Sequence, residues 1–186
     1  MLKIILMRHS EADYTFVRAR NYIGHGLDLA QLTEEGIELA EKASFDSRLD
    51  DAEIIVSSPY TRALQTAAIL SKNRQLNIKI ELGLHEWMPD LTFQFADKAA
   101  ADEAAERFMK NKGACPKDSD IKYENIDDLF DRAKNALLSY MKYKKIIVVT
   151  HGMLMDRFVS TSKIPHCGIY EIDFDESFAC KKFDYL

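Results

Sequence analysis

Two arginines, two histidines and one glutamate stand at or soon after the ends of short apolar runs in this sequence. They are Arg8, His9, Arg62, Glu86 and His151. The planar fork of an arginine binds two oxygens of a phosphate or a carboxylate at once. A histidine beside a bound phosphate can act as nucleophile or acid, and a carboxyl group can protonate a leaving oxygen. Each residue alone has an ordinary structural explanation, but the combination predicts a site for a tetrahedral anion.

The apolar runs that precede these residues predict the strands that position them. Residues 2–7 form a short, bounded run that is apolar on both faces, as a central parallel strand is. Ligands bind at the carboxyl edge of open α/β sheets, which is where Arg8 and His9 then lie. The run 146–150 has the same character and leads directly into His151. We therefore expect both histidines at one edge of a sheet.

A second strand is expected over residues 53–57, followed by a helix that carries Arg62. Ser58 is a candidate N-cap, and Pro59 then occupies the first helical position, where proline is best tolerated. This reading places Arg62 near the positive end of a helix that continues to about Leu70.

The remaining patterns predict alternating strands and helices. A third strand over 76–82 leads to Glu86, and residues 11–33 are expected to be a loop. Helices are expected over 34–45, 97–110, from 126 onward and over 153–160, with Thr33 and Asn125 as caps. Alternation over 169–174 and 178–183 predicts a closing hairpin or edge strand. Together these elements predict a three-layer α/β/α domain with a mostly parallel central sheet.

Length and composition set limits on the kind of protein. The 186 residues fit one domain, 1–186, with a helical insertion at about 89–123. The net charge of −5 argues against a nucleic-acid partner, and no apolar run approaches the length of a membrane span. Three cysteines without CxxC spacing and the lack of a signal peptide predict a cytoplasmic protein with reduced thiols. The histidines lack metal-ligand spacing, so no metal is expected.

Five stretches, in this order, resemble the signatures of the histidine phosphatase superfamily, the phosphoglycerate mutase-like enzymes. They are Leu6-Met7-Arg8-His9-Ser10-Glu11, Leu32-Thr33-Glu34-Glu35-Gly36, Ser57-Ser58-Pro59-Tyr60-Thr61-Arg62-Ala63-Leu64-Gln65-Thr66-Ala67, Leu84-His85-Glu86 and Val148-Val149-Thr150-His151-Gly152. Each stretch alone is a weak signal, whereas five in sequence are strong. The resemblance spans nearly the whole chain apart from 89–123.

The resemblance implies a role for each site residue. His9 would be the nucleophile that becomes phosphohistidine, and Arg8, Arg62 and His151 would hold the phosphoryl oxygens. Glu86 would give a proton to the leaving group and then take one from the attacking water. Ser10, at a position where the family most often has glycine, would border the phosphate. The resemblance implies a metal-independent phosphomonoesterase of the histidine acid phosphatase type, without a cofactor.

Two departures bear on the reaction type. The mutases and many sugar-phosphate phosphatases carry Ser or Thr where this chain has Ala12, and Asn where it has Thr15. The chain is also shorter than a typical phosphoglycerate mutase, and both points favour a phosphatase. The alternatives are mutase-type phosphoryl transfer and a non-catalytic phosphate-binding protein.

The substrate stays open among a small sugar phosphate, a nucleotide and a phosphohistidine on another protein. The oligomeric state is also open. We expect residues 89–123 and the loop 14–30 to form a lid over the leaving group.

Overall fold

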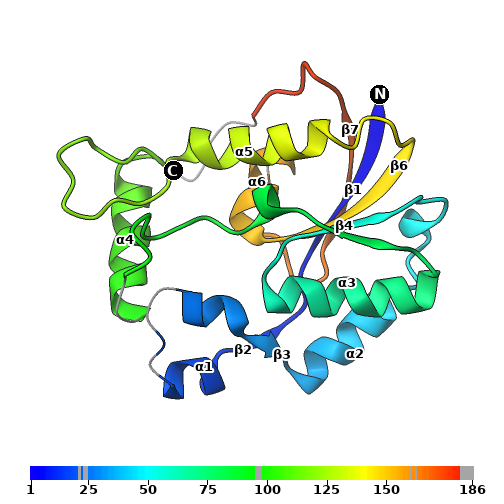
Figure 1. Cartoon of the computed structure of the whole chain (residues 1–186), viewed down its shortest axis with the longest axis horizontal. Coiled ribbons are helices and arrows are strands. Elements are labelled where there is room, and N and C mark those ends of the chain that lie inside the picture. The colour runs from blue at the N-terminus through cyan, green and yellow to red at the C-terminus, as the bar shows by residue number, and fades with distance from the viewer. Residues whose placement is uncertain (21, 23–24, 95–97, 160, 162, 181–186) are drawn as a thin grey trace.

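The structure is a computed structural model that describes residues 1–20, 22, 25–94, 98–159, 161 and 163–180. Its main feature is a five-stranded sheet in the order β5–β4–β6–β1–β7 (Figure 1). The strands are β1 (Leu2–Arg8), β4 (Ile55–Ser57), β5 (Ile78–Ile80), β6 (Lys145–Thr150) and β7 (Ile169–Phe174). The first four are mutually parallel, and β7 pairs antiparallel with β1 at one edge. The predicted mostly parallel sheet is therefore confirmed.

Alternation along the strands divides the core into two layers. Ile4 and Leu6 of β1 pack on one face of the sheet, and Ile5 and Met7 pack on the other. The first face is covered by α5 (Ile126–Leu138) and α6 (Gly152–Val159), and the second by α2 (Glu34–Ala43) and α3 (Thr61–Arg74). In Figure 1, α5 lies above the sheet, and α2 and α3 lie below it. Helices thus cover both faces, as predicted.

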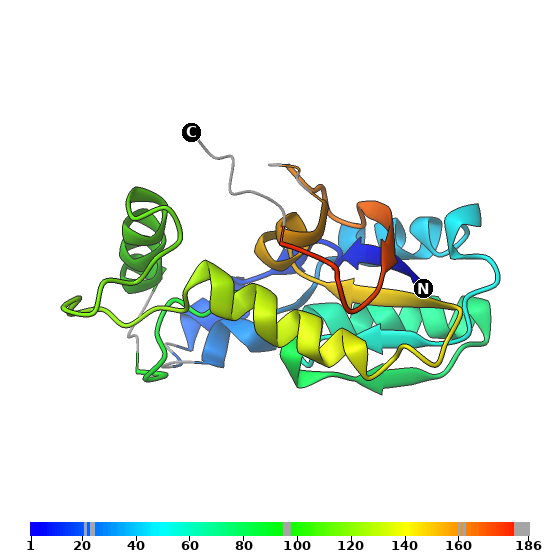
Figure 2. The same ribbon diagram turned by 90° about the horizontal axis from the view of Figure 1, so that it is seen from above.

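The segment predicted as an insertion contains α4 (Lys98–Lys110), which stands away from the sheet in both ribbon views (Figures 1 and 2). An aromatic cluster joins it to the domain. The ring of Trp87 lies 4.9 Å from that of Phe108 on α4 and 6.0 Å from that of Tyr123. All three side chains are buried. The segment is therefore anchored next to Glu86, which precedes Trp87.

Short elements replace the loop that the sequence predicts over 11–33. They are β2 (Ala12–Asp13), α1 (Thr15–Ala19), η1 (His25–Leu29) and β3 (Gln31–Leu32). β2 and β3 form a small antiparallel ribbon separate from the main sheet. Two further 3-10 turns are η2 (Ser47–Leu49) and η3 (Leu82–Leu84). Within the part of the chain that the structure describes, no helix is long and apolar enough to cross a membrane.

Both predicted boundaries of the helix that carries Arg62 are wrong. α3 begins at Thr61, because Tyr60 is its extended N-cap residue and the hydroxyl of Ser58 contacts a histidine ring instead. It ends at Arg74, beyond the predicted end at about Leu70, where Gln75 turns left-handed with φ of 56°.

The second strand of the closing hairpin is also not formed over 175–180, and the rest of that prediction lies outside the described residues. Phe178 instead packs on aromatic rings of the core, those of Phe130, Phe158 and Phe174.

The central strand offers a direct test of the core. Leu6 is fully buried, so Leu6→Ala should lower the free energy of unfolding by about 2–5 kcal/mol through lost burial and a cavity. Leu82→Ala, at a leucine that is 71% exposed, is the matched control and should cost less than about 0.5 kcal/mol. Urea unfolding followed by far-UV circular dichroism measures both. Equal effects would contradict the assigned core.

Candidate active site

The register of β1 and β6 brings the two histidines together. Arg8 pairs with Thr150, so the residues that follow them, His9 and His151, leave the sheet side by side. The His9 amide donates to the Thr150 carbonyl at 2.9 Å, which extends the pairing by one residue. The two rings lie with their centroids 5.1 Å apart. The predicted meeting of the two strand ends therefore occurs.

The hydrogen bonds of His9 define which ring nitrogen carries the proton. Its Nδ1 lies 2.7 Å from the carbonyl oxygen of Ser10, which can only accept, so Nδ1 is protonated. Arg62 donates its Nε–H to Nε2 at 3.2 Å. A guanidinium has no acceptor, so Nε2 must offer its lone pair. His9 is thus a neutral imidazole with a nucleophilic Nε2.

The same reasoning applies to His151, which is fully buried. Arg62 Nη2 lies 3.3 Å from its Nδ1, so this nitrogen accepts. Its Nε2 then carries the proton and donates to Ser58 Oγ at 2.7 Å. Ser58 is a site residue that the sequence analysis missed, because it was read only as a helix cap.

Burial and positive neighbours keep both rings neutral. Desolvation is the main cause that lowers the pKa of His9 to about 3, and Arg62 and Arg8 lower it further. The pKa of His151 is also held well below its usual value, again first by burial and then by Arg62. Because the rings stay uncharged, they add no repulsion to the two arginines.

Arg62 lies at the centre of this group and is 6% exposed. Besides the two rings, it donates to the carbonyl of Leu27 at 3.3 Å. Its guanidinium also lies 5.1 Å from the ring centroid of Tyr60 and 5.9 Å from that of Tyr14, within range of a cation–π attraction. Residues from five separate segments of the chain therefore contact this one cation.

Arg8 provides a second cation with spare hydrogen-bonding capacity. Its Nη1 donates to the carbonyl of Ile164 at 2.6 Å. Its Nε is buried and, among the described residues, has no acceptor. A Cβ built at Gly152 would lie 3.6 Å from this Nε, so the guanidinium rests beside the start of α6. A buried donor of this kind is suited to an anionic acceptor.

The carboxylate of Glu86 contacts the N-terminus of α6. It accepts from the amides of Met153 and Leu154, each at 3.3 Å, and from the amide of Trp87 at 2.9 Å. The free amides at the start of a helix favour such a partner. Glu86 also borders two cavities, one lined by Arg62 and the other by Arg8. Glu86 therefore shares one cavity with each arginine.

An ion pair on the α5 side holds the loop that carries Glu86. Arg132 donates to the carbonyls of Gly83 and His85, each at 2.8 Å, and to that of Glu86 at 3.1 Å. Its Nε bonds to Glu124 at 2.6 Å, and Glu124 also accepts from the amide of Met88. The sequence analysis named neither member of this pair, since nothing local links Arg132 to residues 83–88.

Ser10, which the resemblance places beside the phosphate, makes two hydrogen bonds within the protein. Its hydroxyl donates to the carbonyl of Gly36 at 2.6 Å, and its amide donates to Thr66 Oγ1 at 3.0 Å. A Cβ at Gly36 would lie 2.3 Å from the carbonyl oxygen of Glu11, so only glycine allows α2 to approach this closely. Thr33 caps the same helix by accepting from the Gly36 amide at 2.8 Å. These residues fix the loop after His9.

A third histidine, His166, lies near the nucleophile. Its ring centroid is 5.7 Å from that of His9, and burial lowers its pKa. It belongs to the segment before β7, where the Cys167 amide donates to the Arg8 carbonyl at 3.1 Å. No motif in the sequence pointed to it. Among the described residues, no group of three or more His, Cys, Asp or Glu could hold a metal ion.

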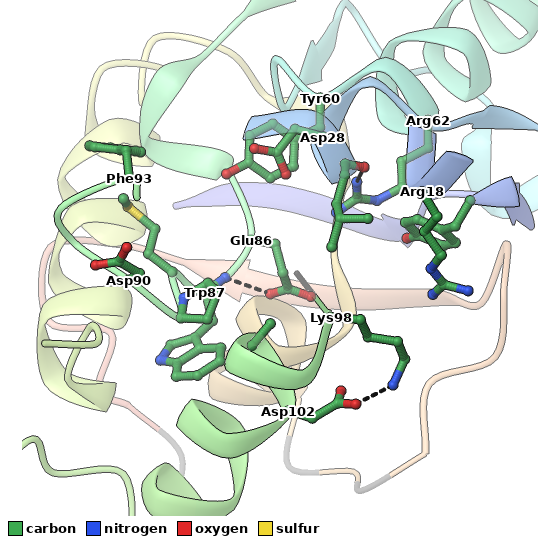
Figure 3. A pocket seen from close by; sticks show the side chains of 15 residues that line it. Arg18, Asp28, Tyr60, Arg62, Glu86, Trp87, Asp90, Phe93, Lys98 and Asp102 are labelled. Carbon is green, nitrogen blue, oxygen red and sulfur yellow. Dashed lines mark hydrogen bonds and ion pairs between the residues drawn. The ribbon is translucent and has the colours of Figure 1, made fainter. Parts of the chain in front are cut away.

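A cavity of about 280 Å³ opens beside Glu86 and Arg62 (Figure 3). Its walls come from both segments that were expected to form a lid. Tyr14, Arg18 and Asp28 contribute from one side, and Phe93 and Lys98 contribute from the other. Both expected lid segments therefore border one cavity next to Glu86, and their role over a leaving group stays a prediction.

The sequence and the fold together define the class of the protein. Residues 4–176 match the family model of the histidine phosphatase superfamily (branch 1). The chain therefore belongs to this superfamily. A search of the curated proteins finds no match.

Solved structures share the fold. Bacillus stearothermophilus YhfR superposes with a TM-score of 0.69 at 20% identity, covering 98% of this chain and 95% of that one. The alpha-ribazole phosphatase from Shigella flexneri gives 0.66 at 22% identity over 96% and 94%. Mycobacterial glucosyl-3-phosphoglycerate phosphatase Rv2419c, as its complex with VO3, gives 0.68 at 18% identity over 98% and 96%.

The ion pair on α5 can be tested through stability. In Arg132→Met the carboxylate of Glu124, which is 6% exposed, loses its charged partner, and the free energy of unfolding should fall by about 3–5 kcal/mol. Arg107→Met removes a partly exposed arginine from its pairs with the exposed Glu103 and Asp120 and should cost less than about 1 kcal/mol. Urea unfolding compares the two variants, and similar losses would contradict the structural role of Arg132.

The lowered pKa of His9 predicts how stability depends on pH. Between an unfolded value near 6.5 and a folded value of about 3, the unfolded chain binds more protons than the folded one. The free energy of unfolding should therefore decrease as the pH falls through this window. His9→Gln removes this contribution, so its stability should decline less steeply. Urea unfolding at several pH values gives both curves, and parallel curves would refute a neutral, buried His9.

Proposed function

We propose that this protein hydrolyses phosphomonoesters through a phosphohistidine formed at Nε2 of His9. The observation that carries the proposal is the tautomer of His9. Nδ1–H is bound to the Ser10 carbonyl, and Nε2 presents a lone pair beside the cation of Arg62. A neutral imidazole is the nucleophilic form, and the lowered pKa maintains it throughout the neutral pH range.

In the first step the Nε2 lone pair is released from its hydrogen bond to Arg62 and attacks phosphorus, and the bond from phosphorus to the ester oxygen breaks. Glu86, in its protonated form, gives a proton to that oxygen, so the leaving group departs as an alcohol. In the second step a water attacks phosphorus while Glu86 takes its proton. The bond between phosphorus and Nε2 then breaks, which releases inorganic phosphate and restores His9 and the acid.

Arg8, Arg62 and His151 are proposed to hold the phosphoryl oxygens. Transfer of a phosphoryl group depends mainly on position and on stabilisation of charge, which two buried or partly buried guanidinium groups supply. The Nε–H of Arg8, which has no acceptor among the described residues, can donate to a phosphoryl oxygen. His151 would have to exchange a bond to Arg62 or Ser58 for one to the phosphate. The hydroxyl and the amide of Ser10 are bonded to Gly36 and Thr66, so Ser10 supports the loop and would bind phosphate only by exchanging one of these bonds.

The positive charge of this site also supports metal-independent chemistry, which we include in the proposal. Two structural relatives are named as phosphatases, which supports phosphatase activity at the level of the superfamily. A phosphoryl-acceptor assay separates hydrolysis from mutase-type transfer, since a mutase passes the group to a second hydroxyl. The cytoplasmic location expected from the sequence stays a prediction.

The decisive experiment is hydrolysis of p-nitrophenyl phosphate in the presence of EDTA. Wild-type activity should survive the chelator, and His9→Gln should lower kcat by at least about a thousandfold because the covalent step is lost. Quenching with alkaline detergent during turnover of a ³²P-labelled ester should trap a protein-bound label that is stable to alkali and is lost when acid is added. The label should be absent from the variant.

Retained vanadate binding and an unchanged circular dichroism spectrum would show that the variant is folded. Undiminished hydrolysis by folded His9→Gln would overturn the mechanism. Loss of wild-type activity with EDTA would overturn its metal independence.

A further inference from the structure

The cavity beside Glu86 has largely aromatic and apolar walls. Beyond Glu86 and Arg62, its apolar lining consists of Tyr14, Leu27, Tyr60, Trp87, Met88, Pro89, Phe93 and Ala101. Figure 3 shows Tyr60 and Phe93 on separate sides of the space around Glu86. Aromatic rings offer flat surfaces against which an apolar or cyclic group can stack. At about 280 Å³ the cavity suits a small organic group and not a folded protein.

The charged residues of this cavity do not favour a second anion. Its carboxylates, apart from Glu86, are Asp28, Asp90 and Asp102, and its cations, apart from Arg62, are Arg18 and Lys98. Lys98 forms an ion pair with Asp102 (Figure 3). The guanidinium of Arg18 lies 5.2 Å from the ring centroid of Tyr14. The net formal charge of the residues that line the cavity is therefore negative when Arg62 is assigned to the phosphate.

The two arginines and the wall of the cavity thus favour different parts of a substrate. The phosphate is drawn to Arg8 and Arg62, whereas the group beyond Glu86 meets aromatic rings and carboxylates. Asp28 is the carboxylate that most affects the hydroxyl of Tyr60, whose pKa is raised by burial first and by Asp28 second. Asp28 and Tyr60 both line the cavity, so a leaving group that contacts the Tyr60 ring also lies near this carboxylate.

We propose that the substrates are monophosphate esters whose leaving group has an apolar, preferably aromatic face and carries no negative charge. The inference rests on the proposed function and narrows it. It disfavours esters with a carboxylate or a second phosphate on the leaving group, as in a phosphoglycerate. A positively charged amine on the leaving group is compatible with the carboxylates and with the aromatic rings.

Three phenyl phosphates of similar size test the charge preference. They are 4-ethylphenyl, 4-(2-aminoethyl)phenyl and 4-(carboxymethyl)phenyl phosphate. In the two charged esters, two methylenes and one methylene, respectively, separate the charge from the phenyl ring. The carboxymethyl ester should have a kcat/KM lower than that of the ethyl ester by about tenfold, from repulsion at several ångströms in a partly buried site. The aminoethyl ester should equal or exceed the ethyl ester. Equal or faster turnover of the carboxymethyl ester would overturn the proposal.

A pair of alkyl esters tests the apolar face. Benzyl phosphate should exceed glycerol 1-phosphate in kcat/KM by about tenfold, because the phenyl ring buries apolar surface in the cavity. Both leaving groups are primary alcohols, so the chemical step is comparable. A preference for the glycerol ester would also overturn the proposal.

An Asp28→Asn variant tests whether the carboxylate of Asp28 repels an anionic leaving group. In this variant the difference in kcat/KM between the carboxymethyl and ethyl esters should fall to about threefold. Asp51→Asn is the matched control, since Asp51 lies outside the cavity and asparagine tolerates its left-handed φ of 61°. It should leave this difference at its wild-type size. An unchanged difference in a folded Asp28→Asn variant would overturn the assignment to this wall.

Failure of the underlying function gives a separate result. If wild type and His9→Gln hydrolyse all of these esters equally or not at all, the proposed function is wrong. If hydrolysis depends on His9 but favours the anionic or the polar ester, only the substrate class is wrong.

Discussion

The hydrogen-bonded register of three parallel strands is the constraint on which the rest of the site depends. Arg8 pairs with Thr150, and Ser57 pairs with Val149, so β1, β6 and β4 end at nearly the same level. The residues that follow these ends then meet without any long loop to place them. A shift of one strand by a single residue would turn its side chains to the opposite face and separate the two histidines.

Arg62 determines the tautomers of the two histidines that this register brings together. Because a guanidinium only donates, its N–H groups require lone pairs from both rings and thereby select a tautomer for each. The carbonyl of Ser10 and the hydroxyl of Ser58 complete the selection from the other side of each ring. Hydrogen bonding thus sets the reactivity of His9 before any substrate arrives.

Local patterns in the sequence were enough to predict the sheet, its covering helices and the meeting of His9 with His151. Apolar runs report buried strands directly, and parallel strands share one carboxyl edge. The supports of Glu86 could not be predicted, because Arg132 acts on a loop 46 or more positions away in the chain. Gly36 shows the reverse case. It belongs to a family-like motif, yet its part is steric, since it lets α2 approach the backbone of Glu11.

The charge of the site also affects the whole molecule. Among the described residues, neither Arg8 nor Arg62 forms an ion pair with a carboxylate, although the Nε of Arg8 is buried and Arg62 is 6% exposed. Keeping such cations away from water opposes folding. An oxyanion that binds them stabilises the folded state in proportion to the logarithm of its concentration. With the proposed phosphate as that oxyanion, its concentration in the surrounding solution would contribute to the stability of the folded protein as well as to its turnover.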